Sequence, residues 1–212
     1  MRRSDVLRAS PRMFESDLLD RLSRIHPVVP PVIFIPVIAV LFALGQEGRA
    51  PLPVAGTIFA GYAFWTLTEY WLHRLVFHFE PDVGWGQRLH WIIHGVHHDH
   101  PNDPLRLVMP PSVSVPLAAA FYGLFVLVLP PGTAQLFASG FLAGYLAYDM
   151  THYYVHHRRP TSALGKRLRE WHMRHHFQDE TRGFGVSMPL WDFVFRTPQR
   201  RPARGLERKS IV

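Results

Sequence analysis

Four long runs of apolar residues constrain this chain more than any other feature of its sequence. A helix rises about 1.5 Å per residue, so about 20 residues are needed to cross a hydrocarbon core of about 30 Å. Each run approaches that length, lacks Lys and Arg, and holds at most one carboxylate. Their ranges are 28–44, 52–72, 112–129 and 133–150. We therefore predict four transmembrane helices.

The distribution of charge predicts how these helices are oriented. Thirteen Lys and Arg stand against five Asp and Glu from Arg158 to Val212, and six Arg stand against four acids in residues 1–27. Cytoplasmic segments carry an excess of basic residues, so both termini and the polar segment 73–111 are predicted on the cytoplasmic side. The expected fold class is an all-α, multi-pass integral membrane protein with four transmembrane helices and a cytoplasmic helical cap. One domain covers 28–212, and its cap consists of 73–111 and 151–212.

The segment 1–27 is predicted to lie on the membrane surface. Its apolar residues recur at helical spacing between charged ones, as in an interfacial amphipathic helix. They are Phe14, Leu18, Leu19, Leu22 and Ile25. A mobile polar tail is the alternative, whereas a cleavable signal peptide is not expected, because the charged stretch is long and no small-residue cleavage site follows it. The Arg-rich, Lys-poor composition favours a bacterial inner membrane over the endoplasmic reticulum.

Ten to twelve of the 14 histidines lie in four short clusters. Two clusters have the spacing His-x-x-His-His, which on a helix places three imidazoles within an arc of about 100°. The clusters are His73 with His78; His94, His97 and His98; His152 with His156 and His157; and His172, His175 and His176. The predicted topology places all four on the cytoplasmic side, although up to about a hundred residues separate them. This convergence predicts a metal site.

Ten imidazoles are too many for one ion, since zinc takes four ligands and larger ions take about six. Two ions with five nitrogens each are therefore predicted. His73 and His78 lie five residues apart, or roughly 140° around a helix, so we expect them to serve different ions. Imidazole binds iron, copper, zinc and nickel, so the residue type does not select the metal. His26 and His100 have no partner at ligand spacing and are not expected to bind.

Two carboxylates are placed to orient imidazoles from outside the ligand set. Glu69 lies four residues before His73, and Asp149 lies three before His152, on the same helix faces. Polarity of the membrane interface is the alternative explanation for both. Tyr153 is one of several aromatic residues that could line a lipid path, although an aromatic belt at the membrane interface is the more ordinary explanation.

Several classes of protein are disfavoured. The chain has no cysteine, which removes disulfides, thiolate metal sites and cysteine nucleophiles. Its net charge of +7 could suggest nucleic acid, but the basic residues do not interleave with aromatics in one patch. A metal transporter would spread ligands across the bilayer midplane, and a haem protein would need only two axial ligands. Hydrolytic zinc chemistry would call for an HExxH motif or its inverse, and neither is present.

Four segments closely resemble the fatty acid 2-hydroxylase branch of the membrane fatty acid hydroxylase and sterol desaturase superfamily. They read EYWLHRLVFH at 69–78, LHWIIHGVHHDHPNDPLRLVMPP at 89–111, GYLAYDMTHYYVHH at 144–157, and WHMRHHF followed by GFGVSMPLWDFVF through 195. The histidine spacings carry the likeness to the superfamily, and PNDPLRLVMPP and GFGVSMPLWD carry the likeness to the branch. The resemblance covers about two thirds of the chain. Met109 and Arg196 stand where the family more often has Phe and Gly, and neither is at a ligand position.

The resemblance implies a site as well as a family. It implies metal ligation by His73, His78, His94, His97, His98, His152, His156, His172, His175 and His176, with His90 and His157 near the site. It further suggests that one ion is held by His73, His94, His152, His172 and His176, and the other by His78, His97, His98, His156 and His175.

The implied activity is an O2-dependent monooxygenation at C2 of a fatty acyl chain, free or in a ceramide-like sphingolipid. The implied cofactors are two metal ions, iron for activity, with zinc able to replace it in purified protein and with neither haem nor flavin. Many eukaryotic members carry a cytochrome b5 domain, for which this chain has no room. Electrons are therefore expected from a separate cytochrome b5-like or ferredoxin-like donor on the cytoplasmic face. A related oxygenase acting on a carotenoid or sterol is the alternative.

Overall fold

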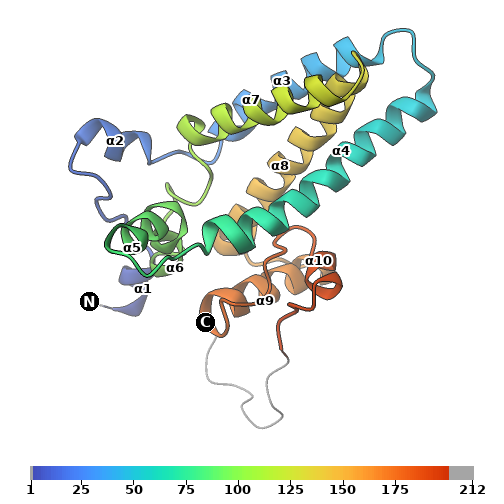
Figure 1. The fold of residues 1–212 in the computed structure, drawn as a ribbon. Helices are drawn as coiled ribbons and strands as arrows, with labels where there is room; N and C mark the ends of the chain where they lie inside the picture. The colour runs from blue at the N-terminus through green and yellow to red at the C-terminus, as the bar shows by residue number, and fades with distance from the viewer. Residues whose placement is uncertain (1, 201–212) are drawn as a thin grey trace.

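The computed structural model describes residues 2–200, and over that range helices are the only regular secondary structure. Four long helices run side by side, and the short helices gather at one end of them (Figure 1). The long helices are α3 (Val29–Gln46), α4 (Pro51–Leu72), α7 (Pro111–Val128) and α8 (Thr133–His157). The short ones are α1 (Arg3–Leu7), α2 (Asp17–Leu22), η1 (His73–Phe77), α5 (Gly84–His90), η2 (Trp91–Gly95), α6 (Val96–Asp99), α9 (Ala163–Phe177) and α10 (Leu190–Val194).

The four long helices agree closely with the four apolar runs of the sequence. Prolines begin α4 and α7, where a missing N–H costs nothing, because the first N–H groups of a helix have no partner in any case. Among the long helices, α8 is the exception: it continues past the apolar run to His157, because residues 151–157 contain neither Pro nor Gly. The histidines that follow the fourth run are therefore still helical.

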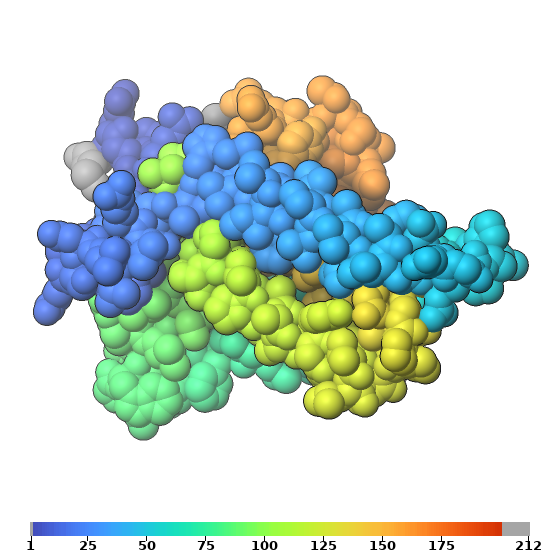
Figure 2. Space-filling view, turned by 90° about the horizontal axis from the view of Figure 1, so that it is seen from above, coloured from blue at the N-terminus to red at the C-terminus, as the bar shows by residue number. Residues whose placement is uncertain are grey.

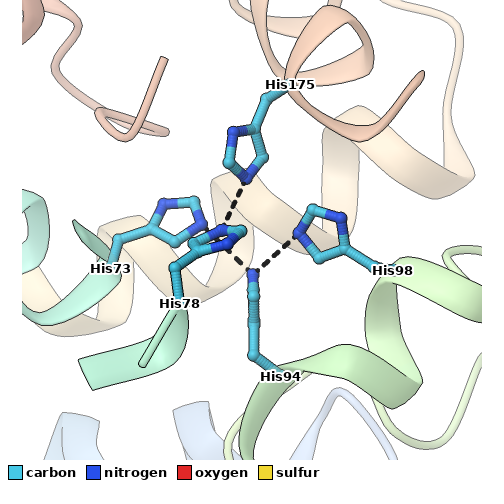
Figure 3. A group of neighbouring side chains, drawn as sticks. All are labelled: His73, His78, His94, His98 and His175. Carbon is cyan, nitrogen blue, oxygen red and sulfur yellow. Dashed lines mark hydrogen bonds between the residues drawn. The ribbon is translucent and has the colours of Figure 1, made fainter. Parts of the chain in front are cut away.

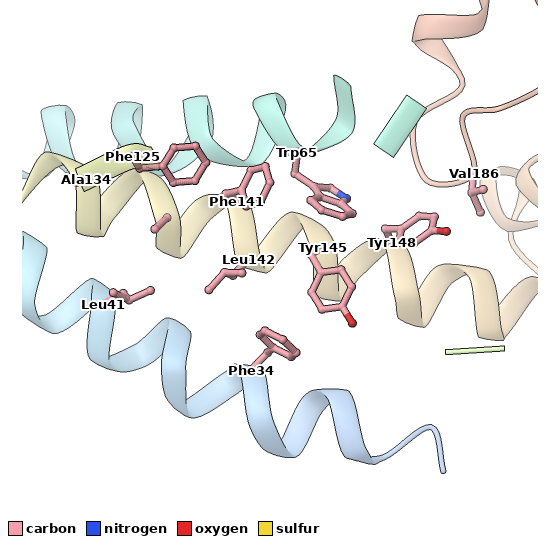
Figure 4. Packing of buried hydrophobic residues seen from close by; sticks show 11 residues of the cluster. Phe34, Leu41, Trp65, Phe125, Ala134, Phe141, Leu142, Tyr145, Tyr148 and Val186 are labelled. Atoms are coloured by element: carbon pink, nitrogen blue, oxygen red, sulfur yellow. The ribbon is translucent and has the colours of Figure 1, made fainter. Parts of the chain in front are cut away.

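The long helices pack around α8, which contacts α3, α4 and α7. The core is largely aromatic: the Trp65 and Tyr145 rings meet edge to face with centroids 5.3 Å apart, and the Phe34 and Tyr145 rings do so at 4.9 Å (Figure 4). Close approach of α4 and α8 depends on glycine. A Cβ on Gly140 would lie 2.0 Å from the carbonyl oxygen of Ile58, so only glycine fits there. The GxxxG spacing of Gly140 and Gly144 thus marks a real helix contact.

The outer faces of the long helices are apolar. Figure 2 shows α3 and α7 exposed on one face of the molecule, and their exposed side chains include Val32, Ile35, Leu44 and Leu127. By length and composition, α3 and α7 are candidates for membrane spans, and among the described residues α4 and α8 do not meet the same criterion. The prediction of four spans with a cytoplasmic cap therefore stays a prediction.

Both hairpin turns between the long helices lie at the end opposite the short helices (Figure 1). Arg49 in the first turn donates to the carbonyl oxygen of Pro131 at 2.9 Å and to the hydroxyl of Thr133 at 3.3 Å in the second. The polar segments between and beyond the long helices consequently share the other end.

The N-terminal segment differs from expectation. In place of the single amphipathic helix expected there, two short helices, α1 and α2, are separated by a non-helical stretch that contains Pro11. The position of this segment on a membrane surface stays a prediction. Ser16 begins α2 by accepting the N–H of Leu19 on its side chain. The segment nevertheless keeps an apolar surface, since Leu18, Leu19 and Leu22 are exposed.

Candidate metal centre

Two short π-helical segments carry the first histidines of the site. In η1 the N–H of His78 bonds to the carbonyl of His73 at 3.3 Å, so the turn closes over five residues instead of four. Residues five apart then align on one face, and the rings of His73 and His78 have centroids 5.1 Å apart. Single π turns are rare and occur mainly at functional sites. The expectation that these two histidines serve different ions is wrong, because it assumed α-helical geometry.

The ten clustered histidines form two groups of five. We call the first the H78 group: His73, His78, His94, His98 and His175 (Figure 3). We call the second the H97 group: His97, His152, His156, His172 and His176. In each group every residue offers one ring nitrogen, and these nitrogens all lie within 4.8 Å of one another.

This grouping corrects the partition suggested by the family resemblance. Histidines four apart on a helix stay together, as His94 with His98, His152 with His156, and His172 with His176 do. The second histidine of each His-x-x-His-His motif turns to the other group: His97 meets His152 of α8, and His175 meets His78 at the end of η1. Each triad therefore contributes to both groups, and the arc of about 100° between its members separates their targets.

The donor set fits a pair of metal ions. Neighbouring Nε2 atoms lie 3.2 Å apart in His73 and His94, 3.0 Å in His78 and His175, 2.9 Å in His97 and His152, and 2.8 Å in His156 and His172. Two nitrogens at about 2.1 Å from one ion and at roughly 90° to each other would be about 3.0 Å apart. The nitrogens are thus spaced as ligands that share an ion.

The environment keeps the imidazoles neutral. Burial lowers the pKa of His78 to about 3 and that of His175 to about 4, and for His78 the neighbouring His175 adds to the effect. Burial also lowers the pKa of His94, His97 and His172 well below the usual value. A metal ligand must offer an unprotonated nitrogen, so at neutral pH these rings are ready to bind without first losing a proton.

Backbone carbonyls of one loop fix two rings of the H78 group. His73 donates its Nδ1–H to the carbonyl oxygen of Phe184 at 2.7 Å, and His175 donates its Nδ1–H to that of Arg182 at 2.8 Å. Each bond sets the tautomer that leaves Nε2 free as a ligand. Residues 182–187, which we call the carbonyl loop, were not identified as site residues from the sequence, because backbone acceptors leave no residue signature.

The carbonyl loop is itself held by two buried carboxylates. Asp192, fully buried, accepts the N–H groups of Phe184 at 2.9 Å and Gly185 at 2.8 Å. Glu69 accepts the N–H groups of Val186 and Ser187, each at 2.8 Å, and the hydroxyl of Ser187. Glu69 therefore acts on the loop, and the expectation that it orients His73 directly is corrected.

Asp149 is also bound to backbone instead of imidazole. Its carboxylate accepts the N–H of Met109 at 3.2 Å and the hydroxyl of Tyr145 at 3.3 Å. The expectation that it orients His152 directly is likewise corrected: within residues 2–200, Nδ1 of His152 has no hydrogen-bond partner. A carboxylate that the sequence did not suggest, Glu180, lies 3.7 Å from Nδ1 of His98.

The remaining expected neighbours lie at the edge of the site. The ring of His90 lies 6.2 Å from that of His78, and Tyr153 stacks on His157 at 4.3 Å. His26 and His100, not expected to be ligands, lie outside both groups. Nδ1 of His100 donates to the carbonyl of Val6 at 2.6 Å, and Nδ1 of His26 accepts the N–H of Val28 at 3.3 Å.

A largely apolar cavity of about 310 Å³ leads to both groups. Three ligand candidates reach its wall, His94 from the H78 group and His97 and His152 from the H97 group. The other lining residues lie in residues 13–23, at Phe77, in residues 92–96 and 106–113, and at Tyr148 and Asp149 of α8. Its volume is at the lower end of the roughly 300–1,000 Å³ typical of ligand sites.

Comparisons with known proteins agree on one family. The fatty acid hydroxylase family model matches residues 58–197. Dihydroceramide fatty acyl 2-hydroxylase FAH2 of Arabidopsis thaliana is 40% identical over 188 residues, which are 88% of this chain and 79% of that protein. Fatty acid 2-hydroxylase of Homo sapiens is 35% identical over 208 residues, and the match covers 88% of this chain but 56% of the human protein. A solved structure of full-length scs7p, with only the hydroxylase domain visible, superimposes with a TM-score of 0.83 at 35% identity, covering 88% of this chain and 72% of that one.

Proposed function

This chain belongs to the fatty acid hydroxylase family, and from that premise we propose that it hydroxylates C2 of a fatty acyl chain, free or within a ceramide-like lipid. The observation that carries the proposal is the cavity, because its lining is largely apolar and includes His94, His97 and His152. An acyl chain is the kind of ligand whose reacting carbon such a cavity would place beside both groups.

The reaction needs a redox-active pair of ions. The H78 and H97 groups would each hold one, and a pair of iron ions would supply the activation of O2 that an unactivated C–H bond requires. One oxygen atom enters the C–H bond at C2, the other leaves as water, and two electrons and two protons are consumed. The electrons are proposed to come from a separate donor that docks on the cytoplasmic face.

The chain's own residues bind and orient the substrate. Apolar walls from residues 107–109 and Phe77 would exclude water from the carbon that reacts. Tyr148 and Asp149 bring polar groups to the cavity near His152, and Asp149 also fixes Met109, another lining residue. The position of C2 relative to both groups would then be set by packing along the cavity, which can contribute strongly to rate.

The membrane placement is proposed with the reaction. We infer four spans, both termini in the cytoplasm and a cap formed by 73–111 and 151–212 in one domain with the spans, supported by the collection of the polar segments at one end (Figure 1). Part of the basic tail, residues 201–212, lies outside the described residues. A bacterial inner membrane remains a prediction from composition, and the relatives reported above with their organisms are eukaryotic.

Lipid analysis tests the proposal. Cells expressing the protein should accumulate 2-hydroxy acyl groups, and His97→Ala should abolish the accumulation while His26→Ala, an exposed histidine outside both groups, should not. Hydroxylation at another carbon, or equal 2-hydroxy levels in the wild type and His97→Ala, would contradict the assignment. Metal analysis together with thermal unfolding of the same purified proteins separates loss of an ion from loss of the fold.

A further inference from the structure

The outer wall of the cavity is formed by the N-terminal segment, which carries none of the metal-site histidines. Met13, Phe14, Leu19, Leu22 and Ser23 all line it. These residues precede the part of the chain that the family model matches, which begins at residue 58. This outer wall of the cavity is thus built by a part of the chain separate from the part that would hold the ions.

The segment is held on the cavity by one buried ion pair. Nη2 of Arg106 lies 2.7 Å from the carboxylate of Asp20, and the two side chains are 3% and 13% exposed. Arg106 also donates to the hydroxyl of Ser23 at 3.2 Å and to the carbonyl of Pro11. Since Arg106 lines the cavity as well, the same side chain belongs to one wall and anchors the other.

Further bonds fix the two ends of the segment. The carboxylate of Asp20 accepts the N–H of Met13 at 2.7 Å, which folds the stretch before α2 back onto the helix. The N–H of Ile25 donates to the carbonyl of Leu105 at 2.6 Å, and Arg88 donates to the carbonyl of Met13. The wall is therefore a positioned structure and not a loose tail.

Two leucines of α2 mark where the cavity meets the outside. Leu19 and Leu22 line the cavity and are also 49% and 45% exposed, so both stand at its mouth. Leu18, on the same helix, is 66% exposed and does not line the cavity. The exposed leucines give the mouth an apolar rim, which suits entry of a lipid chain from a membrane.

We propose that residues 11–24 are the specificity-determining wall of the acyl cavity, positioned by the Asp20–Arg106 pair, and that the side chains at 19 and 22 decide which acyl chains are accepted. The inference rests on the proposed function for the identity of the ligand. It assigns no chemistry to the segment, because none of the ten histidines of the two groups belongs to it.

Paired leucine substitutions test the wall. Cells receiving saturated fatty acids of graded length should show a changed ratio of long to short 2-hydroxy products for Leu19→Phe and Leu22→Phe, and the wild-type ratio for Leu18→Phe. A change of roughly tenfold is expected, since a single methylene in an apolar site is discriminated by that factor or more. Asp20→Asn should broaden the range of chain lengths, because the wall loses its charged anchor.

A second readout does not depend on turnover. The acyl chains that co-purify with each variant are extracted and their lengths compared, with thermal unfolding as the check that the variants fold. Wild-type ratios in Leu19→Phe and Leu22→Phe, by products and by bound lipids, would overturn the inference while leaving the 2-hydroxylase proposal intact. If neither the wild type nor any variant makes 2-hydroxy product but the bound chain lengths differ as expected, the inference about the wall is supported and the reaction assignment fails.

Discussion

The Nδ1 atom of His73 lies 2.7 Å from the carbonyl oxygen of Phe184, and the N–H of Phe184 is in turn 2.9 Å from the carboxylate of Asp192. A buried carboxylate is thereby connected to a metal-site imidazole through a single residue of backbone. The carbonyl loop also fixes His175, so the H78 group depends on this loop at two of its five rings.

Asp192→Asn should selectively lower the metal affinity of the H78 group. The amide replaces one acceptor by a donor, so the N–H of Gly185 or that of Phe184 loses its partner and the carbonyl loop shifts. Loss of such an outer contact typically lowers metal affinity by about 10–100-fold. Metal-to-protein ratios are measured during titration with a chelator. One ion should leave at a lower chelator concentration than in the wild type, and the other at the same chelator concentration as in the wild type.

The exposed Asp82→Asn variant is the control for this experiment. Simultaneous loss of both ions together with a large fall in melting temperature would indicate a general structural role for Asp192. Wild-type retention of both ions would remove the connection to His73 altogether.

Double substitutions of equal size test the grouping of the histidines. His94→Ala with His98→Ala removes two nitrogens from the H78 group and should leave about one ion per chain, because the H97 group keeps all five of its nitrogens. His97→Ala with His98→Ala removes one nitrogen from each group and should weaken metal binding by both groups. The partition suggested by family resemblance expects the second pair, not the first, to spare one ion. Metal stoichiometry of the two proteins decides between them.

Acid should destabilise the metal-free protein as the pH falls below about 6.5. The pKa values of His78 and His175 are lowered by burial to about 3 and about 4, against about 6.5 in an unfolded chain. Between these values the unfolded chain binds more protons, so the free energy of unfolding is highest above about pH 6.5 and falls as the pH drops towards 4. Denaturant unfolding of chelator-treated protein across this range measures the slope.

Protein loaded with metal is the matched comparison, because a bound ion competes with the proton for the same nitrogen. Its stability should hold to lower pH than that of the metal-free protein. Equal pH profiles with and without metal would show that the clustered imidazoles are not the groups that titrate.

Glycine should be indispensable where α4 and α8 meet and dispensable on the open face of another helix. Gly140→Ala places a Cβ against the carbonyl of Ile58 and forces the helices apart, at a cost of roughly 1–3 kcal/mol. Gly123→Ala on α7 meets no atom within 4 Å and should be neutral or slightly stabilising. Thermal unfolding of the two variants in the same detergent gives the comparison, and equal melting temperatures would contradict the packing argument.

The long helices could be predicted from the sequence because helix formation follows local composition. The absence of charge over 28–44 and 112–129 gave the bounds of α3 and α7 to within two residues. The types and spacing of the histidines predicted a metal site, and the family resemblance is confirmed by the family model. These features depend on neighbours in the chain, so the order of residues is enough to specify them.

Only the tertiary structure decided which histidines act together. The π turn at His73 aligns it with His78, and the outward turn of His97 towards α8 depends on where that helix packs. The role of Asp192 and the wall at Leu22 were equally hidden, since both arise from contacts between segments far apart in the chain. Spacing along a helix fixes the angles between side chains, whereas the partner met at each angle is set by the packing of the whole chain.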